Sequence, residues 1–250
     1  MTTTDGGQLE LRGPATGLLD EPFVLRVRGA GPAAELRWRA RYRDDDDRVW
    51  RAAAARCEDL ATSWSPAKEG TGAIAALRSL RPLSVDVRVE TPDGRAAART
   101  VTRLLAGEGV RSRRWRDGLA ATLHVPTGTP CATVVVDATA GATEAAVATL
   151  AASLLASRGV LALVVASARG DVAAEPLAVA RERLAAVPGA GGAIVVLPAL
   201  DPFGAADPGS GVVLPPGVGA RDVRPGAAAE RAAAWDALLG RLGAQPRATA

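Results

Sequence analysis

Polar side chains follow the apolar runs in the second half of the chain, and their types could support acyl-group or acid–base chemistry. Asp137 and Asp201 could exchange protons as a pair of carboxylates, and the hydroxyl of Ser167 could become a nucleophile beside a base. A hydroxyl at the end of a strand is the alternative interpretation of Ser167. The candidate catalytic residues are therefore Asp137, Ser167 and Asp201, and the candidate ligand-binding residues are Thr139, Arg169 and Ser210.

Nucleophilic catalysis also needs a base, and His124 is the sole histidine of the chain. It falls in an expected strand that would run antiparallel to its neighbours, far from the edge where ligands bind to parallel sheets. We therefore expect His124 to make a local hydrogen bond and not to act as a base. Cys57 and Cys131 have no partner motif, and no cationic neighbour is evident for Cys131. Both are expected to be small buried apolar residues, Cys57 within the β-sandwich.

The first half of the chain alternates apolar and charged residues, which is typical of strands with one buried face. Strands are expected at 21–28, 35–42, 49–55, 84–91, 96–104, 110–116 and 119–125. The run of acids at 44–47 is expected to form a solvated turn, because its spacing does not suit a calcium loop. Trp38, Trp50, Trp64 and Trp115 are expected in the core of a β-sandwich or at a domain interface.

After Pro126 the pattern changes to apolar strands that alternate with helices, which indicates a parallel sheet with both faces covered. Strands are expected at 132–137, 160–167 and 193–197, and helices at 143–157, 171–187 and 227–242. The expected polar candidates would meet at the carboxyl edge of these parallel strands. The segment 198–226 is rich in proline and glycine and gives no clear element.

Composition limits the possible partners. The net charge is +3, and Lys68 is the only lysine among the basic residues, which indicates a bacterial-like, GC-rich composition. The arginines alternate with apolar residues or face acids, so no nucleic-acid partner is expected. The two cysteines favour a reduced, cytoplasmic protein without a metal or other cofactor. No apolar run reaches the roughly 18 residues of a membrane span, so no membrane partner is expected.

Several segments resemble the acyl-CoA thioesterases and bile acid-CoA:amino acid N-acyltransferases. One similarity to the N-terminal β-sandwich of that family lies near the start of the chain. It consists of Leu19-Asp20-Glu21-Pro22-Phe23 followed by a Gly-x-Gly-Pro turn. The acidic turn before Val49-Trp50 continues this similarity. The segments 103–110, 119–126, 154–163 and 234–239 are similar to the start and the last helix of its α/β-hydrolase domain.

The resemblance implies a Ser or Cys nucleophile, a His base and an Asp, with the nucleophile after the strand at 193–197. At that place the chain has Ala199 between Pro198 and Pro202, and alanine cannot attack a carbonyl. Asp137 stands where the family has an oxyanion loop, and its carboxylate would oppose a developing oxyanion. The resemblance also implies a block that carries the triad acid and histidine. This block is absent from the chain, because the segment between this strand and the last helix is short and contains no histidine.

The expected fold is α/β with an N-terminal all-β part: an immunoglobulin-like β-sandwich at 10–108 and a reduced α/β-hydrolase-like parallel sheet at 109–245. The expected function is that of a degenerate relative that binds an acyl thioester, a related small molecule or a partner protein without hydrolysis. Two alternatives stay open: an active thioesterase, acyltransferase or cyclase that uses residues at the carboxyl edge, and a homodimer joined through an exposed sheet edge. The arginine-rich strand faces are interpreted as solvated, with weak binding of acyl-CoA phosphates as the alternative.

Overall fold

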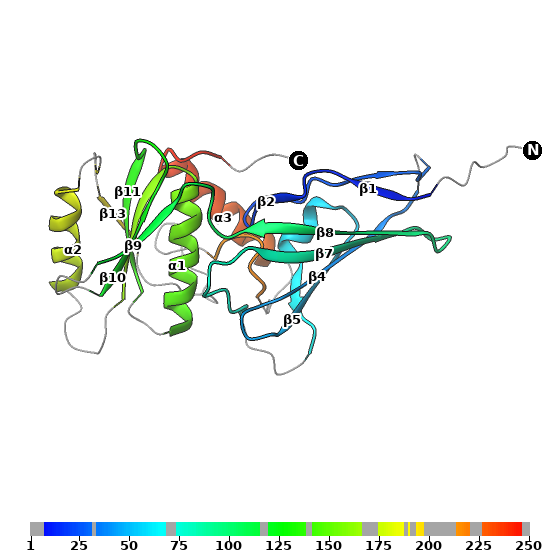
Figure 1. Cartoon of the computed structure of the whole chain (residues 1–250), viewed down its shortest axis with the longest axis horizontal. Coiled ribbons are helices and arrows are strands. Elements are labelled where there is room, and N and C mark those ends of the chain that lie inside the picture. The colour runs from blue at the N-terminus through cyan, green and yellow to red at the C-terminus, as the bar shows by residue number, and fades with distance from the viewer. Residues whose placement is uncertain are drawn as a thin grey trace, which may run out of the picture.

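Two sheets, one from each half of the chain, lie side by side with helices between them (Figure 1). The computed structural model of the 250-residue chain describes residues 8–31, 34–68, 74–115, 120–138, 142–166, 175–187, 190, 194–197, 214–220 and 227–246. The molecule is a mixed α/β protein with more strands than helices, as the sequence predicted at this level. An immunoglobulin-like sandwich and an α/β-hydrolase-like sheet remain predictions.

The first half forms a six-stranded sheet whose strands alternate as their sequences predict. In its central strand, Trp38, Ala40 and Tyr42 are buried and the arginines between them are exposed. Burial of one face holds this register, because a slip by one residue would expose the apolar set. From one edge to the other, the strands are β2 (Thr16–Leu18), β8 (Ala96–Leu104), β7 (Leu83–Glu90), β4 (Arg37–Arg43), β5 (Val49–Ala54) and β6 (Trp64–Pro66).

A two-stranded ribbon of β1 (Glu10–Arg12) and β3 (Arg26–Arg28) accompanies this sheet, and a 3-10 helix, η1 (Glu58–Thr62), precedes β6. The strand expected at 21–28 was too long, since only its last three residues pair. Before them the chain turns, and the carboxylate of Glu21 accepts a hydrogen bond from the backbone N–H of Leu18 at 2.9 Å. Phe23 and Leu25 are nevertheless buried, so the apolar residues were correctly assigned to the core.

The second half forms a five-stranded sheet close to the predicted pattern. Gly159, with φ of +90°, ends the first helix in the left-handed conformation that glycine adopts readily. The sheet order is β13 (Ile194–Leu197), β11 (Ala132–Asp137), β12 (Val160–Val165), β10 (Ala121–Val125) and β9 (Arg111–Trp115); the helices are α1 (Ala142–Ser157), α2 (Glu175–Ala185) and α3 (Ala227–Arg241).

The strands of the five-stranded sheet run in two directions. β11 is parallel to both β12 and β13, whereas β10 is antiparallel to β12 and to β9. Helix α2 covers one face, and α1 and α3 lie on the side that faces the six-stranded sheet (Figure 1). Alternate residues of β12 accordingly belong to two apolar clusters, with Leu161 and Leu163 on the α2 side and Val160 and Ala162 on the other.

The larger of the two apolar clusters is continuous between the sheets. It joins Trp50 and Val87 of the six-stranded sheet with Leu154 of α1 and Trp235 of α3. Residues 214–220, although late in the chain, also contribute Leu214 and Val218 to this cluster. The two sheets are therefore held by a shared core in addition to the chain that connects β8 to β9.

Candidate functional site

Asp137 lies at the carboxyl edge of the parallel strands, where the sequence placed the candidate site. It is the last residue of β11, it is level with Val165 at the end of β12, and its side chain is partly buried. The neighbouring strand β13 ends one residue lower, with Leu197 beside Val136. The remaining candidates lie outside the described residues: Thr139, Ser167, Arg169, Asp201 and Ser210.

His124 is buried in the middle of the sheet. Its strand β10 is antiparallel to β12, as predicted, and His124 pairs with Ala162, whereas Ala121 pairs with Val165 at the carboxyl edge. Three residues of strand, about 10 Å, therefore separate the levels of His124 and Asp137. Burial of the imidazole lowers the pKa of His124 to about 4. At neutral pH the ring is thus uncharged and a weak base.

A contact between Ser112 and His124 is the feature that sequence reasoning missed. Ser112 lies opposite His124 on the edge strand β9, and its Oγ is 3.0 Å from His124 Nδ1. The predicted β9–β10 hairpin contained the necessary signal, because directly opposed residues share a face of the sheet. A serine beside a histidine is the composition of a nucleophile and its base. However, the other ring nitrogen, Nε2, is buried and has no hydrogen-bond partner among the described residues, so no acid from this part of the chain orients the imidazole.

The two cysteines differ in environment, and one prediction was wrong. Cys57 is buried, and burial raises the pKa of its thiol to about 11, so it is an unreactive core residue as expected. Cys131 was also expected to be buried, but it is exposed because it precedes β11 at the amino edge of the sheet. Its thiol is 3.3 Å from the carbonyl of Gly159.

Two general findings apply to the described part of the chain. Its His, Cys, Asp and Glu side chains form no group of three or more that could hold a metal ion. Its helices include none that is long and apolar enough to cross a membrane.

The outer face of the six-stranded sheet carries an arginine-lined hollow of about 860 Å³. Five arginines line it, but Arg99 on β8 lies directly opposite the buried Val87, so its side chain leaves the sheet on the other face. We call the remaining four the arginine face: Arg39 and Arg41 on β4, Arg51 on β5 and Arg88 on β7. Arg41 lies directly opposite Arg51, and Arg39 lies directly opposite Arg88. Short side chains surround them and leave the hollow open: Ala53, Ser65, Ala98 and Thr100.

Two carboxylates accompany the arginine face. Asp86 is 3.1 Å from Arg41, and it accepts a hydrogen bond from Thr100 at 2.9 Å. These contacts, that with Thr100 above all, lower the pKa of Asp86, so it is ionised at neutral pH. Glu90 lies 2.8 Å from Arg88 and 3.8 Å from Arg39. In the described residues Arg51 has no acidic partner.

A second hollow, of about 470 Å³, adjoins the first along the same strands. Arg41 and Asp86 line both hollows, so the two lie next to each other. The second one adds Arg43 and Arg81 with the hydroxyls of Ser79 and Ser84. Together they could accommodate an extended anionic molecule.

Comparison with protein-family models and with curated proteins gives no match for this chain. The functional conclusions therefore rest on the geometry of the residues. In the described part of the chain, this geometry offers a partly buried carboxylate at the carboxyl edge, a partly buried Ser–His contact and an exposed arginine face. The first two are poorly suited to acyl transfer, whereas the third is suited to binding.

Proposed function

We propose that this protein binds an acyl thioester, a related small molecule or a partner protein without hydrolysing it, on the scaffold of a degenerate thioesterase or acyltransferase. The observation that carries this proposal is the environment of His124, the only imidazole in the chain. Its pKa of about 4 leaves it a weak base at neutral pH. General bases are effective when their pKa lies near the working pH.

The position of His124 also supports a non-catalytic role. Ligands bind to parallel sheets at the carboxyl edge, and His124 lies three residues away from that level. Its imidazole is fully buried, so an acyl thioester could not reach Nε2 without rearrangement of the sheet. The residue at the family's nucleophile position is Ala199, as the sequence already indicates.

Two features of the architecture support the choice of scaffold. An all-β first half precedes a sheet with helices on both faces. The second strand of that sheet, β10, is antiparallel to its neighbours, as the resemblance to α/β-hydrolases implies. A fold supports an analogy and does not by itself assign a function.

The second candidate function is that of an active acyl-transfer enzyme with a non-standard site. The contact of 3.0 Å between Ser112 Oγ and His124 Nδ1 favours it, since a neutral histidine can accept a proton. Ser112 is exposed and could meet a substrate, unlike its partner. Asp137 is the alternative catalytic group, because it lies at the carboxyl edge.

The decisive experiment measures acyl-CoA hydrolysis and covalent adducts with the intact protein. We expect no turnover above the uncatalysed rate, and no ester or thioester adduct by mass spectrometry, for acyl chains of several lengths. Ser112→Ala and Asp137→Asn are the matched variants. Turnover that disappears in one of them while the melting temperature is kept would overturn the proposal and identify the catalytic residue.

A further inference from the structure

We infer that the arginine face is a binding site for a small ligand with two adjacent phosphate groups, such as a pyrophosphate diester. Its four guanidinium groups come from three neighbouring strands and surround one hollow of about 860 Å³. This site lies on the six-stranded sheet, away from the carboxyl edge of the other sheet. The arginine face is therefore a different surface from the carboxyl edge, where the proposed loss of catalysis applies.

The charges of the arginine face are not balanced within the described residues. Four arginines face two carboxylates, Asp86 and Glu90, and Glu90 is shared between Arg39 and Arg88. Arg51 forms no ion pair with a described carboxylate, although Asp86 lines the same hollow. The face thus carries an excess of two positive charges. A pyrophosphate diester carries two negative charges and would match this excess, whereas a single phosphodiester carries only one.

The pairing of the strands makes this excess unfavourable in the free protein. Arg41 and Arg51 are a directly opposed pair, and so are Arg39 and Arg88. Like charges that face each other across two strands destabilise a sheet. An anion between the two pairs would remove this repulsion, so binding should stabilise the fold more than contact with an ordinary surface would.

The shape of the face also suits phosphate groups. Arg51 and Arg39 are diagonal neighbours, with backbone positions about 7–8 Å apart, so long side chains on both can converge on one ligand. Guanidinium groups bind phosphate oxygens through two parallel hydrogen bonds. Because Ala53 and Ala98 have short side chains, they leave the space between the arginines open.

The adjoining hollow of about 470 Å³ would hold the rest of the ligand. It continues from Arg41 and offers the hydroxyl of Ser84 as a hydrogen-bonding group. The hydroxyl of Ser79 already donates to Asp45, which also lines this hollow, at 2.8 Å. Arg81, which also lines it, makes no ion pair with a described carboxylate. A ligand with a polar group attached to its pyrophosphate would fit the two hollows better than inorganic pyrophosphate alone.

The test measures binding of defined anions to the full-length protein by calorimetry and thermal shift at low ionic strength. The anions are orthophosphate, inorganic pyrophosphate, ADP, coenzyme A and a single-stranded oligonucleotide. We expect the compounds with pyrophosphate to bind more tightly than orthophosphate and to raise the melting temperature. ADP and coenzyme A carry their pyrophosphate on a nucleotide, whereas inorganic pyrophosphate is free. Comparing the affinities of the first two with that of the third distinguishes the two sources of the phosphates.

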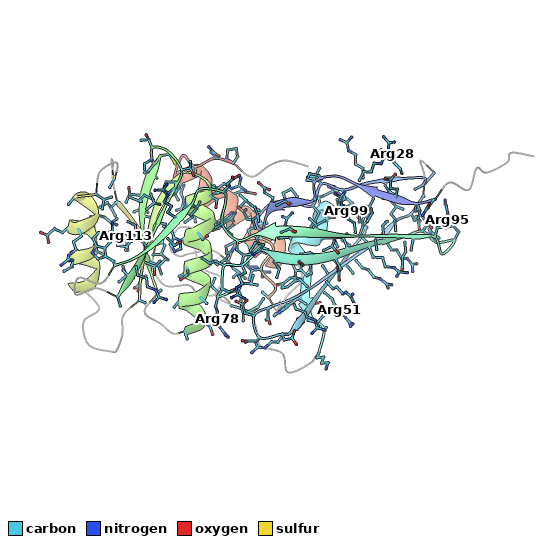
Figure 2. All side chains as sticks on the ribbon, viewed as in Figure 1. Arg28, Arg51, Arg78, Arg95, Arg99 and Arg113 are labelled. Atoms are coloured by element: carbon cyan, nitrogen blue, oxygen red, sulfur yellow. The ribbon has the colours of Figure 1, made fainter. Side chains whose placement is uncertain are left out.

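The variant for this test is the double substitution Arg51→Gln with Arg88→Gln, and Arg113→Gln is the matched control for loss of an arginine. Arg113 lies on β9 of the other sheet, well separated from Arg51 along the molecule (Figure 2). We expect the double variant to bind the pyrophosphate compounds at least about tenfold more weakly, because it loses charged hydrogen bonds to phosphate. The melting temperature of the free variant should not fall, since the substitutions remove like charges that face each other.

Three results would overturn the inference. The first is binding by the double variant as tight as by the parent, and the second is the absence of binding by the parent with every small phosphate compound. The third is binding of a single-stranded oligonucleotide alone, which would make the face a surface for long polyanions. None of these results affects the non-catalytic proposal, which depends on turnover and adducts.

Discussion

Burial holds His124 in its neutral form, and this has a consequence for stability. The pKa of its imidazole falls from 6.5 to about 4 because of desolvation. The unfolded chain therefore takes up the proton first as the pH is lowered. Above pH 6.5 the residue is neutral in both states, and between pH 6.5 and about 4 the folded state progressively loses stability.

We expect this loss to reach about 3 kcal/mol in the free energy of unfolding near pH 4, from the size of the pKa shift. Urea unfolding between pH 7 and pH 4 checks it, with His124→Gln as the comparison. Carboxylates titrate in the same range in both proteins, so the difference between the two curves isolates the histidine. Parallel curves would show that His124 does not titrate differently on folding.

Some residue environments could be predicted from the sequence and others could not. The alternation of β10 was enough to place His124 away from the carboxyl edge. The exposure of Cys131 was missed, because its burial depends on where β11 begins, and strand ends are poorly defined by sequence. Trp115 was assigned to the sandwich or a domain interface, but it lies on β9, opposite Ala121, and packs against the apolar cluster under α2.

At the scale of elements, the acidic run 44–47 is a docking point for a distant segment, whereas a solvated turn was expected. The chain does turn there, but Asp44 is only 7% exposed. Its Oδ1 accepts hydrogen bonds from the backbone N–H groups of Asp46 and Arg48 at 3.0 and 2.9 Å. Its Oδ2 accepts from Trp50 Nε1 and the N–H of Ala76, both at 3.0 Å.

Asp44→Asn should therefore destabilise the protein, since an amide nitrogen cannot accept hydrogen bonds. Whichever oxygen the nitrogen replaces, two donors in buried or partly buried contacts lose their acceptor, and we expect a decrease of about 2–4 kcal/mol in the free energy of unfolding. The same change at Asp47, whose side chain is 84% exposed, is the control and should have an effect within about 0.5 kcal/mol. Urea unfolding at pH 7 measures both. Equal stability of the two variants would contradict the role of Asp44.

Regular elements were the most predictable part of the fold. The periodicities predicted β8 at its observed bounds and α1 within one residue, because long patterns average over local exceptions. Three short strands, β1, β2 and β6, were not predicted. Each has three residues, too few for an alternation to be recognised, and pairing with neighbours decides their conformation.

At the scale of the whole molecule, the halves are more interdependent than the change of sequence pattern suggested. The N–H of Gly219 donates to the hydroxyl of Tyr42 at 2.9 Å, and Ala220 forms an isolated bridge with Ile74. A side chain at Gly219 would collide with Trp50. The late segment 214–220 thus completes the core of the first sheet, and no local pattern in it could indicate a partner so far away in sequence.

A buried ionic cluster joins the two halves. Asp20 follows β2 and is fully buried, and its carboxylate accepts hydrogen bonds from Arg158 Nη2 at 3.1 Å and from Trp235 Nε1 at 3.0 Å. Arg158 follows α1 and also lies 3.2 Å from Glu21. Nearby, the hydroxyl of Ser153 in α1 donates to the carbonyl of Leu105, in the connection between the sheets, at 2.7 Å.

Removal of one partner from a buried ion pair leaves the other charge uncompensated, so Asp20→Ala should lower the free energy of unfolding by about 3–5 kcal/mol. Because Asp20 contacts Arg158, directly after α1, and Trp235 of α3, tryptophan fluorescence and helical circular dichroism should report the same lowered urea midpoint. Glu108→Ala is the control, since Glu108 is an exposed acid in the connection between the sheets. A midpoint for Asp20→Ala equal to that of Glu108→Ala would mean that the shared apolar core alone joins the two halves.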